Sequence, residues 1–286
     1  MERTAGVTVE AMVVETTGDR DRVSPIWEIG GRGVFVKEVQ AAVLDGRADI
    51  AVHSAKDLPS DRPHGLVIGA VPERGDPRDA LVGSRLDDIP TGATVATGSV
   101  RRRAQLAWLR PDLTFAGLRG NMDTRLAQAE RFAAIVVATA ALDRLGLAGR
   151  ITEALDPDVM LPQVAQGALA VECRVDDLPT REVLAGIEHL PSRRAVDAEW
   201  GYLATLGGSC ELPAGAYAEV GTDPSVRVRG LLASLDGSVL LLDERAGDGD
   251  PGELGRMLAE HLLGVGGAWM MDEDAIAPAR ARGSSA

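Results

Sequence analysis

Three consecutive arginines stand at the start of a predicted helix in TGSVRRRAQL, residues 97–106. The helix follows a short apolar strand, so its first backbone N–H groups and its dipole already favour an anion. Successive helix residues point about 100° apart, so the three side chains cannot all face one ligand, and Arg101 and Arg102 are the candidates. Thr97 and Ser99 precede them in the turn. This corner predicts a carboxylate or phosphate site.

A second corner of the same kind follows in LRGNMDTRL, residues 118–126. Arg119 ends a predicted strand, Asn121 lies in the turn, and Arg125 comes one helical turn later. Since one carboxylate would not occupy four guanidinium groups, the two corners predict a ligand with several negative charges. The alternative is a solvated face with surface ion pairs, which is less expected at two equivalent corners than at one.

The pentapeptide HSAKD, residues 53–57, comes at the C-terminal end of another predicted strand, where α/β folds place ligands. Asp57 could accept a hydrogen bond from an N–H donor or stabilise a developing positive charge, and Lys56 beside it favours the ionised carboxylate. Taken alone, Asp57 also fits a turn before Leu58-Pro59, and His53 is expected to be a packed histidine. Lys56 and Lys37 are the only lysines among 30 basic residues.

The two cysteines of the chain differ in their predicted surroundings. Cys210, in GGSCELP, follows a glycine turn between a helix and a strand, where a thiol is accessible and its thiolate is a strong nucleophile. Cys173, inside the apolar segment LAVEC, is expected in the core. Two cysteines form no disulfide framework and lack the paired spacing of a zinc site, so no metal is expected.

Composition narrows the class of protein. The chain has 286 residues, of which 45% are hydrophobic and 26% charged, enough for two or three compact domains. No apolar run approaches the roughly 18 residues of a membrane span, and no signal-peptide pattern follows the first residues, so we expect a cytoplasmic protein without a membrane partner. The formal net charge of -13 argues against nucleic-acid binding, which needs a broad excess of basic residues.

Alternating strand and helix patterns must position these side chains. Residues 7–14 alternate like a strand, and with a helix at 35–46 and a strand at 49–53 they predict a βαβ unit. Three further strand and helix pairs predict a second α/β domain with a parallel or mixed sheet; the strands are at 93–97, 113–117 and 134–139, and the helices are at 99–109, 121–131 and 140–145.

The pattern changes after a return strand within 161–174 and a helix that begins near residue 177. One helix at 192–206, three strands at 214–219, 226–233 and 238–243, and a last helix at 253–263 predict a smaller α+β domain. We therefore expect a discontinuous first domain at 1–70 and 166–188, a second at 72–164, a third at 190–270, and a disordered tail at 271–286.

Seven motifs occur in order: GRGVFVKE, DIAVHSAKDLP, DPRDALV, TGSVRRRAQL, LRGNMDTRL, QGALAVECR and GSCELPAGAYA. Together they resemble the hydroxymethylbilane synthase family, also called porphobilinogen deaminases, over about residues 7–263. The resemblance implies an α/β fold of three domains, two built like type II periplasmic binding proteins flanking a cleft, plus a smaller C-terminal α+β domain. It also implies a monomer.

The resemblance further implies an activity and residue roles. The family deaminates porphobilinogen and condenses four molecules head to tail onto a covalently bound dipyrromethane primer, releasing the linear tetrapyrrole hydroxymethylbilane. Asp57 matches the catalytic aspartate and Cys210 the cysteine that carries dipyrromethane through a thioether. The implied cofactor-binding residues are Lys56, Ser99, Arg101, Arg102, Arg119 and Asn121, and the implied substrate-binding residues are Lys37, Ser54, Thr97, Arg125 and Gln166.

One departure and two alternatives accompany this resemblance. Family members open with a strand and helix that carry an Arg-x-Ser-x-Leu-Ala-like motif, and no such motif precedes Val7, so we expect the chain to lack that strand and helix. The alternatives are a noncatalytic two-domain protein that binds an anion or a pyrrole, and an inactive, N-terminally truncated paralogue. The binding protein would leave Cys210 and the third domain without a role.

Overall fold

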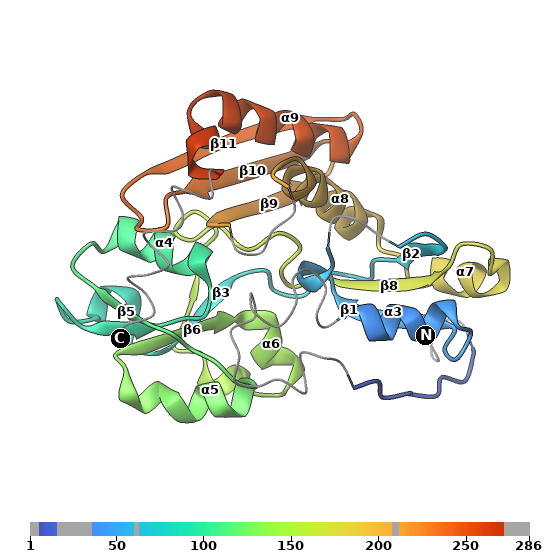
Figure 1. The fold of residues 1–286 in the computed structure, drawn as a ribbon, viewed down its shortest axis with the longest axis horizontal. Coiled ribbons are helices and arrows are strands. Elements are labelled where there is room, and N and C mark those ends of the chain that lie inside the picture. The colour runs from blue at the N-terminus through green and yellow to red at the C-terminus, as the bar shows by residue number, and fades with distance from the viewer. Residues whose placement is uncertain (1–5, 16–35, 60–62, 208–211, 272–286) are drawn as a thin grey trace.

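The computed structural model describes residues 6–15, 36–59, 63–207 and 212–271, and these form three sheets with helices packed around them (Figure 1). The first sheet has the order β1-β8-β2, and β8 runs antiparallel to both neighbours. Its strands are β1 (Ile50–Ser54), β2 (Leu66–Ala70) and β8 (Leu169–Arg174). Helices α3 (Lys37–Leu44) and α7 (Leu178–Ala185) pack against it.

The strand predicted at 7–14 is wrong. These residues form no helix or strand, and the side chain of Val13 is 94% exposed. Alternating residues become a strand only where a neighbouring strand supplies backbone hydrogen bonds, and none of the three described strands of this sheet pairs with them. The predicted βαβ unit is therefore wrong as well, although its helix and its second strand are confirmed as α3 and β1.

The second sheet is mixed, as the sequence predicted, with the order β5-β4-β6-β3-β7. Strand β4 runs parallel to β5 and β6, whereas β3 is antiparallel to β6 and β7. The strands are β3 (Asp79–Gly83), β4 (Thr94–Ala96), β5 (Thr114–Ala116), β6 (Ala134–Ala138) and β7 (Glu153–Leu155). Its helices are α4 (Val100–Leu109), α5 (Met122–Gln128) and α6 (Thr139–Arg144).

The third sheet is an antiparallel meander, β11-β10-β9, covered on one face by two helices (Figure 1). The strands are β9 (Ala214–Val220), β10 (Val226–Ala233) and β11 (Leu240–Gly247), and the helices are α8 (Leu190–Thr205) and α9 (Pro251–Gly264). The two helices approach so closely that a Cβ atom at Gly255 would lie 1.9 Å from the carbonyl oxygen of Ala198. Pro251 at the start of α9 follows the capping residue Asp250.

Short 3-10 helices complete the described chain. The turn η1 (Ala55–Asp57) follows β1 directly and carries two of the predicted site residues. The others are η2 (Leu86–Asp88), η3 (Ala129–Arg131), η4 (Ala148–Arg150) and η5 (Gly267–Met271). The sequence did not predict these turns or the strands β2, β3 and β7, because short apolar runs fit several local structures equally well.

Two segments, 71–79 and 164–168, run between the first and second sheets and touch where they cross. The Gly75 N–H donates to the Gly167 carbonyl oxygen over 3.1 Å. Gly167 has a φ of 86°, and a Cβ atom there would lie 2.6 Å from the Gly75 carbonyl oxygen. Only glycine combines this backbone conformation with so close an approach.

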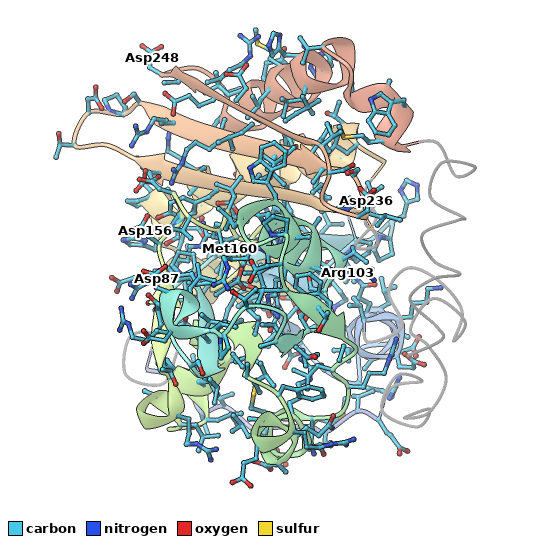
Figure 2. The ribbon with its side chains drawn as sticks, turned by 90° about the vertical axis from the view of Figure 1, so that its left-hand side faces the viewer. Asp87, Arg103, Asp156, Met160, Asp236 and Asp248 are labelled. Carbon is cyan, nitrogen blue, oxygen red and sulfur yellow. The ribbon has the colours of Figure 1, made fainter. Side chains whose placement is uncertain are left out.

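The third sheet lies over the other two and meets α4 of the second (Figures 1 and 2). Figure 2 shows Asp236, on the loop between β10 and β11, above the helix that carries Arg103. A Cβ atom at Gly237 in that loop would lie 2.5 Å from the carbonyl oxygen of Ala104, so this contact also requires glycine. Within the described ranges, no helix has the length and apolar character needed to cross a membrane.

Candidate active site

The turn η1 presents Lys56 and Asp57 at the end of β1. The Ala55 N–H donates to the Ala168 carbonyl oxygen over 3.0 Å, which fixes the turn to the segment that crosses between the sheets. The Asp57 side chain reaches solvent, yet protein atoms surround it closely enough that burial raises the pKa of its carboxyl group. Lys56, His53 and Arg125 act in the opposite direction and favour the carboxylate.

Lys56 has an unusual pKa for a lysine. Burial lowers the pKa of its ammonium group to about 8, an effect that Arg102 and Arg101 add to and that Asp57 and Asp79 oppose. Its Nζ atom donates to Gln166 Oε1 over 3.4 Å. The ammonium group is therefore charged at neutral pH but gives up its proton far more readily than an exposed lysine.

Arg101 and Arg102 form a buried ionic cluster with Asp79. Arg101 Nη1 lies 2.8 Å from Asp79 Oδ2, and Arg102 Nη2 lies 2.7 Å from Asp79 Oδ1. Arg102 Nη1 also donates to the Val136 carbonyl oxygen, and Arg101 Nη1 donates to the Leu161 carbonyl oxygen. All three charged side chains are less than 10% exposed, so two cations share one anion in the interior.

That imbalance leaves an excess of positive charge at this corner and unpaired guanidinium donors beside it. Among the described residues, Arg101 Nε and Nη2 are buried without a hydrogen-bond partner. A buried donor without an acceptor is costly, and a carboxylate is the acceptor that a guanidinium group binds best. A group that carries several carboxylates, such as dipyrromethane, therefore fits this corner.

Gln166 joins the Lys56 turn to the arginine corner. Its Oε1 atom accepts from Lys56 Nζ and from Arg102 Nη2, at 3.4 and 3.2 Å. Its Nε2 atom donates to the Pro77 carbonyl oxygen and to Asp79 Oδ1, at 2.8 and 2.9 Å. The amide oxygen and the amide nitrogen of Gln166 each make two hydrogen bonds, so neither has capacity left for a direct contact with a ligand.

Arg125, in the second arginine corner, interacts electrostatically with Asp57 and with Arg102 of the first corner. Burial lowers the pKa of Arg125, Arg102 and Arg119 lower it further, and Asp57 raises it. Asp57, both corners and Lys56 therefore lie within electrostatic range of one another. Arg125 Nε donates to the Gly120 carbonyl oxygen over 2.8 Å, which orients its side chain.

The polar residues of the two corners shape the helix starts. Ser99 Oγ accepts from the Arg102 N–H at the start of α4, and Thr97 Oγ1 accepts from the Ser99 N–H. Asn121 Oδ1 accepts from the Thr124 N–H and hydroxyl at the start of α5. Ser99 and Asn121 are therefore helix caps that hold the arginines in place.

Three predicted site residues are not joined to this cluster by the described contacts. Lys37 is exposed in the first turn of α3, and Ser54 precedes η1 without capping it through its side chain. Cys210 lies outside the described residues. Gly215, five positions after Cys210, lies against α4: a Cβ atom there would be 3.2 Å from Arg101 Cδ.

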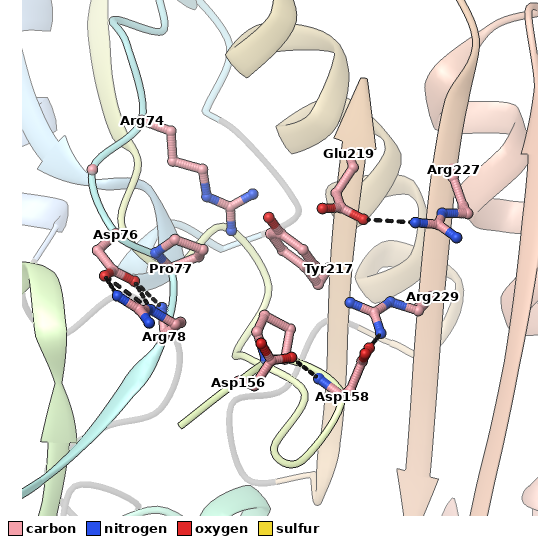
Figure 3. A pocket seen from close by; sticks show the side chains of 12 residues that line it. Arg74, Asp76, Pro77, Arg78, Asp156, Asp158, Tyr217, Glu219, Arg227 and Arg229 are labelled. Atoms are coloured by element: carbon pink, nitrogen blue, oxygen red, sulfur yellow. Dashed lines mark hydrogen bonds and ion pairs between the residues drawn. The ribbon is translucent and has the colours of Figure 1, made fainter. Parts of the chain in front are cut away.

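A separate pocket of about 570 Å³ lies between residues 74–78, residues 156–158 and strands β9 and β10 of the third sheet (Figure 3). Arg74 and Arg229 lie over the ring of Tyr217 in this pocket, at 5.3 and 5.6 Å from its centre. Asp57 does not line it. Its four arginines each pair with an acid: Arg74 with Glu199, Arg78 with Asp76, Arg227 with Glu219 and Arg229 with Asp158.

The sequence did not predict which acidic side chains are buried beside these basic residues. Asp79 partly neutralises the first corner, and Glu199 binds Arg74 and the N–H groups of Ala165 and Ala218, joining the crossing segments to the third sheet. Glu172 pairs with His53 inside the first sheet. The signal was available, because Asp79 and Glu172 stand inside the apolar runs DALV and LAVEC, where a charge requires a partner.

Comparison with known proteins identifies the family. A profile described as porphobilinogen deaminase, dipyromethane cofactor binding domain, matches residues 1–182, and one described as porphobilinogen deaminase, C-terminal domain, matches residues 194–264. The chain belongs to the porphobilinogen deaminase family. The three-domain α/β fold class and the dipyrromethane cofactor predicted from the motifs are thereby confirmed, and Cys173 is buried as predicted.

Individual relatives agree with this assignment. The porphobilinogen deaminase of Nitratidesulfovibrio vulgaris strain Miyazaki F is 43% identical over 278 residues, covering 94% of this chain and 88% of the relative. The corresponding protein of strain Hildenborough is 44% identical, covering 95% and 88%. Among solved structures, the periplasmic VFT2 domain of Bordetella pertussis BvgS covers 53% of this chain and 66% of its own, at 20% identity and a TM-score of 0.31, too low to support an argument.

Proposed function

We propose that this member of the family condenses four porphobilinogen molecules head to tail on a dipyrromethane primer held by Cys210, with Asp57 as its catalytic carboxylate. The observation that carries the proposal is the shared environment of Asp57 and the two arginine corners. Arg125 and Asp57, 68 positions apart, shift each other's pKa. A ring with an acetate and a propionate needs cations for its carboxylates and an anion for the charge formed during reaction, and this cluster offers both.

Asp57 supports the loss of ammonia from the substrate. When ammonia leaves, positive charge develops on the pyrrole, and a nearby carboxylate stabilises it and accepts a hydrogen bond from the pyrrole N–H. Lys56, with a pKa of about 8, can hold a substrate carboxylate as the ammonium ion and can return a proton near neutral pH. The aminomethyl group is already protonated at neutral pH like other alkylamines, so the C–N bond breaks with its electron pair on nitrogen, neutral ammonia leaves and the positive charge stays on the pyrrole.

The arginine corners hold the primer and the growing chain. Bound dipyrromethane supplies the chain end to which each substrate unit is joined. We assign Arg101, Arg102 and Arg119 to its carboxylates, with Lys56, Ser99 and Asn121 supporting them, and Arg125 to the incoming substrate together with Lys37, Ser54 and Thr97. Gln166 supports this arrangement by positioning Lys56 and Arg102.

The intact mass of the purified chain tests this function, with the Cys210→Ser variant beside it. We expect an increment of one dipyrromethane that disappears in Cys210→Ser. The matched control is Cys173→Ser, which alters the other, buried thiol and should keep the increment. A wild-type chain that stays unmodified after incubation with porphobilinogen would instead support the noncatalytic binding protein or the inactive paralogue.

Three further assignments belong to this proposal. We infer a monomer, a cytoplasmic location and domain limits near residues 71, 165 and 189, from the sequence pattern and the family resemblance. Light scattering of the eluting protein measures the first, and fractionation of the source cells measures the second. Limited proteolysis tests the third, because cleavage concentrates in exposed linkers between domains.

A further inference from the structure

Ala165 has a strained backbone conformation. Among the described residues other than glycine, it alone has a positive φ, 58°. The Gln166 N–H donates to the Gln163 carbonyl oxygen over 2.9 Å, so Ala165 is the third residue of a four-residue turn, a position where a positive φ favours glycine. Such strain persists only where the surroundings impose it, and it concentrates at functional sites.

The buried carboxylate of Glu199 binds this residue. Glu199 lies on α8 with its side chain 0% exposed, and its Oε2 atom accepts from the Ala165 N–H over 2.5 Å. Arg74 Nη1 and Nη2 donate to its two oxygens at 2.6 and 3.2 Å, and the Ala218 N–H of β9 donates to Oε1 at 2.8 Å. Each carboxylate oxygen thus accepts two hydrogen bonds, and the turn is tied to α8 and to the third sheet.

Arg74 extends this hold to Gln166. Its Nε atom donates to the Gln166 carbonyl oxygen over 2.8 Å, while its two terminal nitrogens pair with Glu199. Its backbone N–H donates to Ser192 Oγ of α8 over 2.9 Å, which fixes the start of the side chain. One buried ion pair therefore fixes both the backbone N–H that precedes Gln166 and the carbonyl group of Gln166 itself.

The same turn contacts η1 at two points. Gln163 Nε2 donates to the Lys56 carbonyl oxygen, and Gln166 Oε1 accepts from Lys56 Nζ, each over 3.4 Å. Gln166 Oε1 also accepts from Arg102 Nη2 over 3.2 Å. One amide oxygen reaches both cations only if the backbone of the turn points the Gln166 side chain between them.

We propose that Glu199 is a positioning residue of the active site, which holds Ala165 in its left-handed conformation and so orients Gln166. The Gln166 amide oxygen then lies between Lys56 and Arg102. The inference rests on the proposed roles of these two cations in binding cofactor and substrate. Because the acceptor positions of Glu199 are filled by one guanidinium group and two backbone N–H groups, its effect reaches the cations through Gln166.

A double-mutant cycle of kinetic measurements on the cofactor-loaded protein tests this inference. Glu199→Gln leaves one acceptor oxygen where there were two, so the turn loses its hold and kcat/KM for porphobilinogen should fall by about tenfold. Gln166→Ala should cause a similar fall. In the double variant kcat/KM should fall no further, because both changes remove the same interaction. Losses that multiply, to about a hundredfold, would overturn the inference.

Ala165→Gly provides a rescue that packing alone would not give. Without a Cβ atom, residue 165 adopts a positive φ at no steric cost, so the turn can form without the carboxylate. Adding Ala165→Gly to Glu199→Gln should therefore recover most of the lost kcat/KM. A combined variant that folds but recovers nothing would show that Glu199 does not act through this turn.

Glu188→Gln is the matched control, because this carboxylate also joins α8 to segment 71–79. Glu188 Oε1 lies 2.7 Å from Arg193 Nε of α8, and Oε2 accepts from the Val71 N–H over 2.6 Å. None of its side-chain hydrogen bonds in the described part of the chain goes to the turn 163–166. The variant should lower the Tm but keep kcat/KM within about twofold of the wild-type value. An equal kinetic loss here would reduce Glu199 to a structural joint.

Glu199→Asp covers a Glu199→Gln variant that fails to fold. It keeps a counter-ion for Arg74 but is one methylene group shorter, so its carboxylate cannot reach Arg74 and the Ala165 N–H together. Its kinetic effect should likewise vanish in the Gln166→Ala background. An undiminished effect in that background would contradict the proposal.

A readout without turnover distinguishes this inference from the proposed function. The NMR signals of the Gln166 side-chain amide, assigned by their absence from Gln166→Ala, should shift in Glu199→Asp and stay in place in Glu188→Gln. Unshifted signals in Glu199→Asp would rule out the positioning role. If the proposed function fails instead, the wild-type chain lacks the mass increment or the turnover, whatever these signals do.

Discussion

Lys56 and Gln166 lie 110 positions apart in the chain, and the Lys56 ammonium group donates to the Gln166 side-chain oxygen over 3.4 Å. The same oxygen accepts from Arg102, and the amide nitrogen donates to Asp79. One neutral side chain thus connects the turn after β1 to the buried ionic cluster beside β3. The turn η1 and the first arginine corner are therefore linked by hydrogen bonds, although they belong to different sheets.

The pKa of Lys56 predicts an alkaline limit on activity. Because this ammonium group loses its proton around pH 8, kcat/KM should fall above that value. In Lys56→Arg the guanidinium group stays charged, so the limb should disappear from the measurable range, with a lower plateau because the shape differs. An alkaline midpoint that is the same in both proteins would assign the limb to another group.

Removing the carboxylate of Asp57 should stop turnover but not cofactor attachment. Asp57→Asn keeps the size and one acceptor oxygen of the side chain but loses its negative charge, so we expect kcat to fall by about a hundredfold or more. Asp45→Asn, an exposed change on the same polypeptide segment, serves as the control. Normal turnover in Asp57→Asn, measured with porphobilinogen, would remove this residue from the catalytic role.

The shared counter-ion of the first corner should be critical for stability. Asp79→Asn leaves Arg101 and Arg102 buried without an anion, which should cost about 3 to 5 kcal/mol in urea unfolding. Asp112→Asn breaks the pair with Arg110 at the surface and should cost far less. Similar losses in the two variants would contradict the buried cluster.

The same aspartate sets a dependence of stability on pH. Burial alone would raise the pKa of Asp79, but Arg101 and Arg102 lower it well below the ordinary value of 3.8. The stabilisation by the carboxylate is therefore complete above that ordinary value and is lost as the pH falls from there toward the lower, folded-state pKa. The free energy of unfolding of the wild-type chain should drop below pH 4 more steeply than that of Asp79→Asn.

Two glycine variants can separate the effect of backbone strain from that of the close contact between segments 71–79 and 164–168. Gly167 and Gly146 have φ angles of 86° and 71°, so alanine is strained by a similar amount at both. Only at Gly167 would the new Cβ meet backbone, 2.6 Å from the Gly75 oxygen, whereas nothing lies within 4 Å at Gly146. Gly167→Ala should therefore lower the Tm by several degrees more than Gly146→Ala.

The kinetic effect of removing Arg125 can be compared with that of removing Arg103, one of the three consecutive arginines. Arg125→Ala removes a cation that acts on Asp57, and we expect kcat/KM to fall by about 10 to 100 times, the range for a lost hydrogen bond to a charged group. Arg103→Ala is the matched control, because Arg103 points away from the Arg101 and Arg102 cluster. Equal kinetics in the two variants would return Arg125 to the role of a solvated surface charge.

The sequence alone determined the local structure around the site. The cap at Ser99, the apolar run before it and the absence of breakers until Pro111 define α4 within its ten residues, and the same signals mark α5 after Asn121. It also determined the family, because seven ordered motifs specify residue types at fixed spacing. Helix starts and apolar periodicity are short-range properties, so they can be recognised without knowing what the chain packs against.

Only the tertiary structure decided which charges meet and which strands pair. The alternation at 7–14 predicts a strand, but none of the strands in the described part of the chain pairs with this segment, and it is irregular. Arg101 and Arg102 look like free cations in the sequence, yet Asp79, more than twenty positions earlier, partly neutralises them. Backbone pairing and the energy of a buried charge depend on groups distant in the chain, and only folding brings those groups within range.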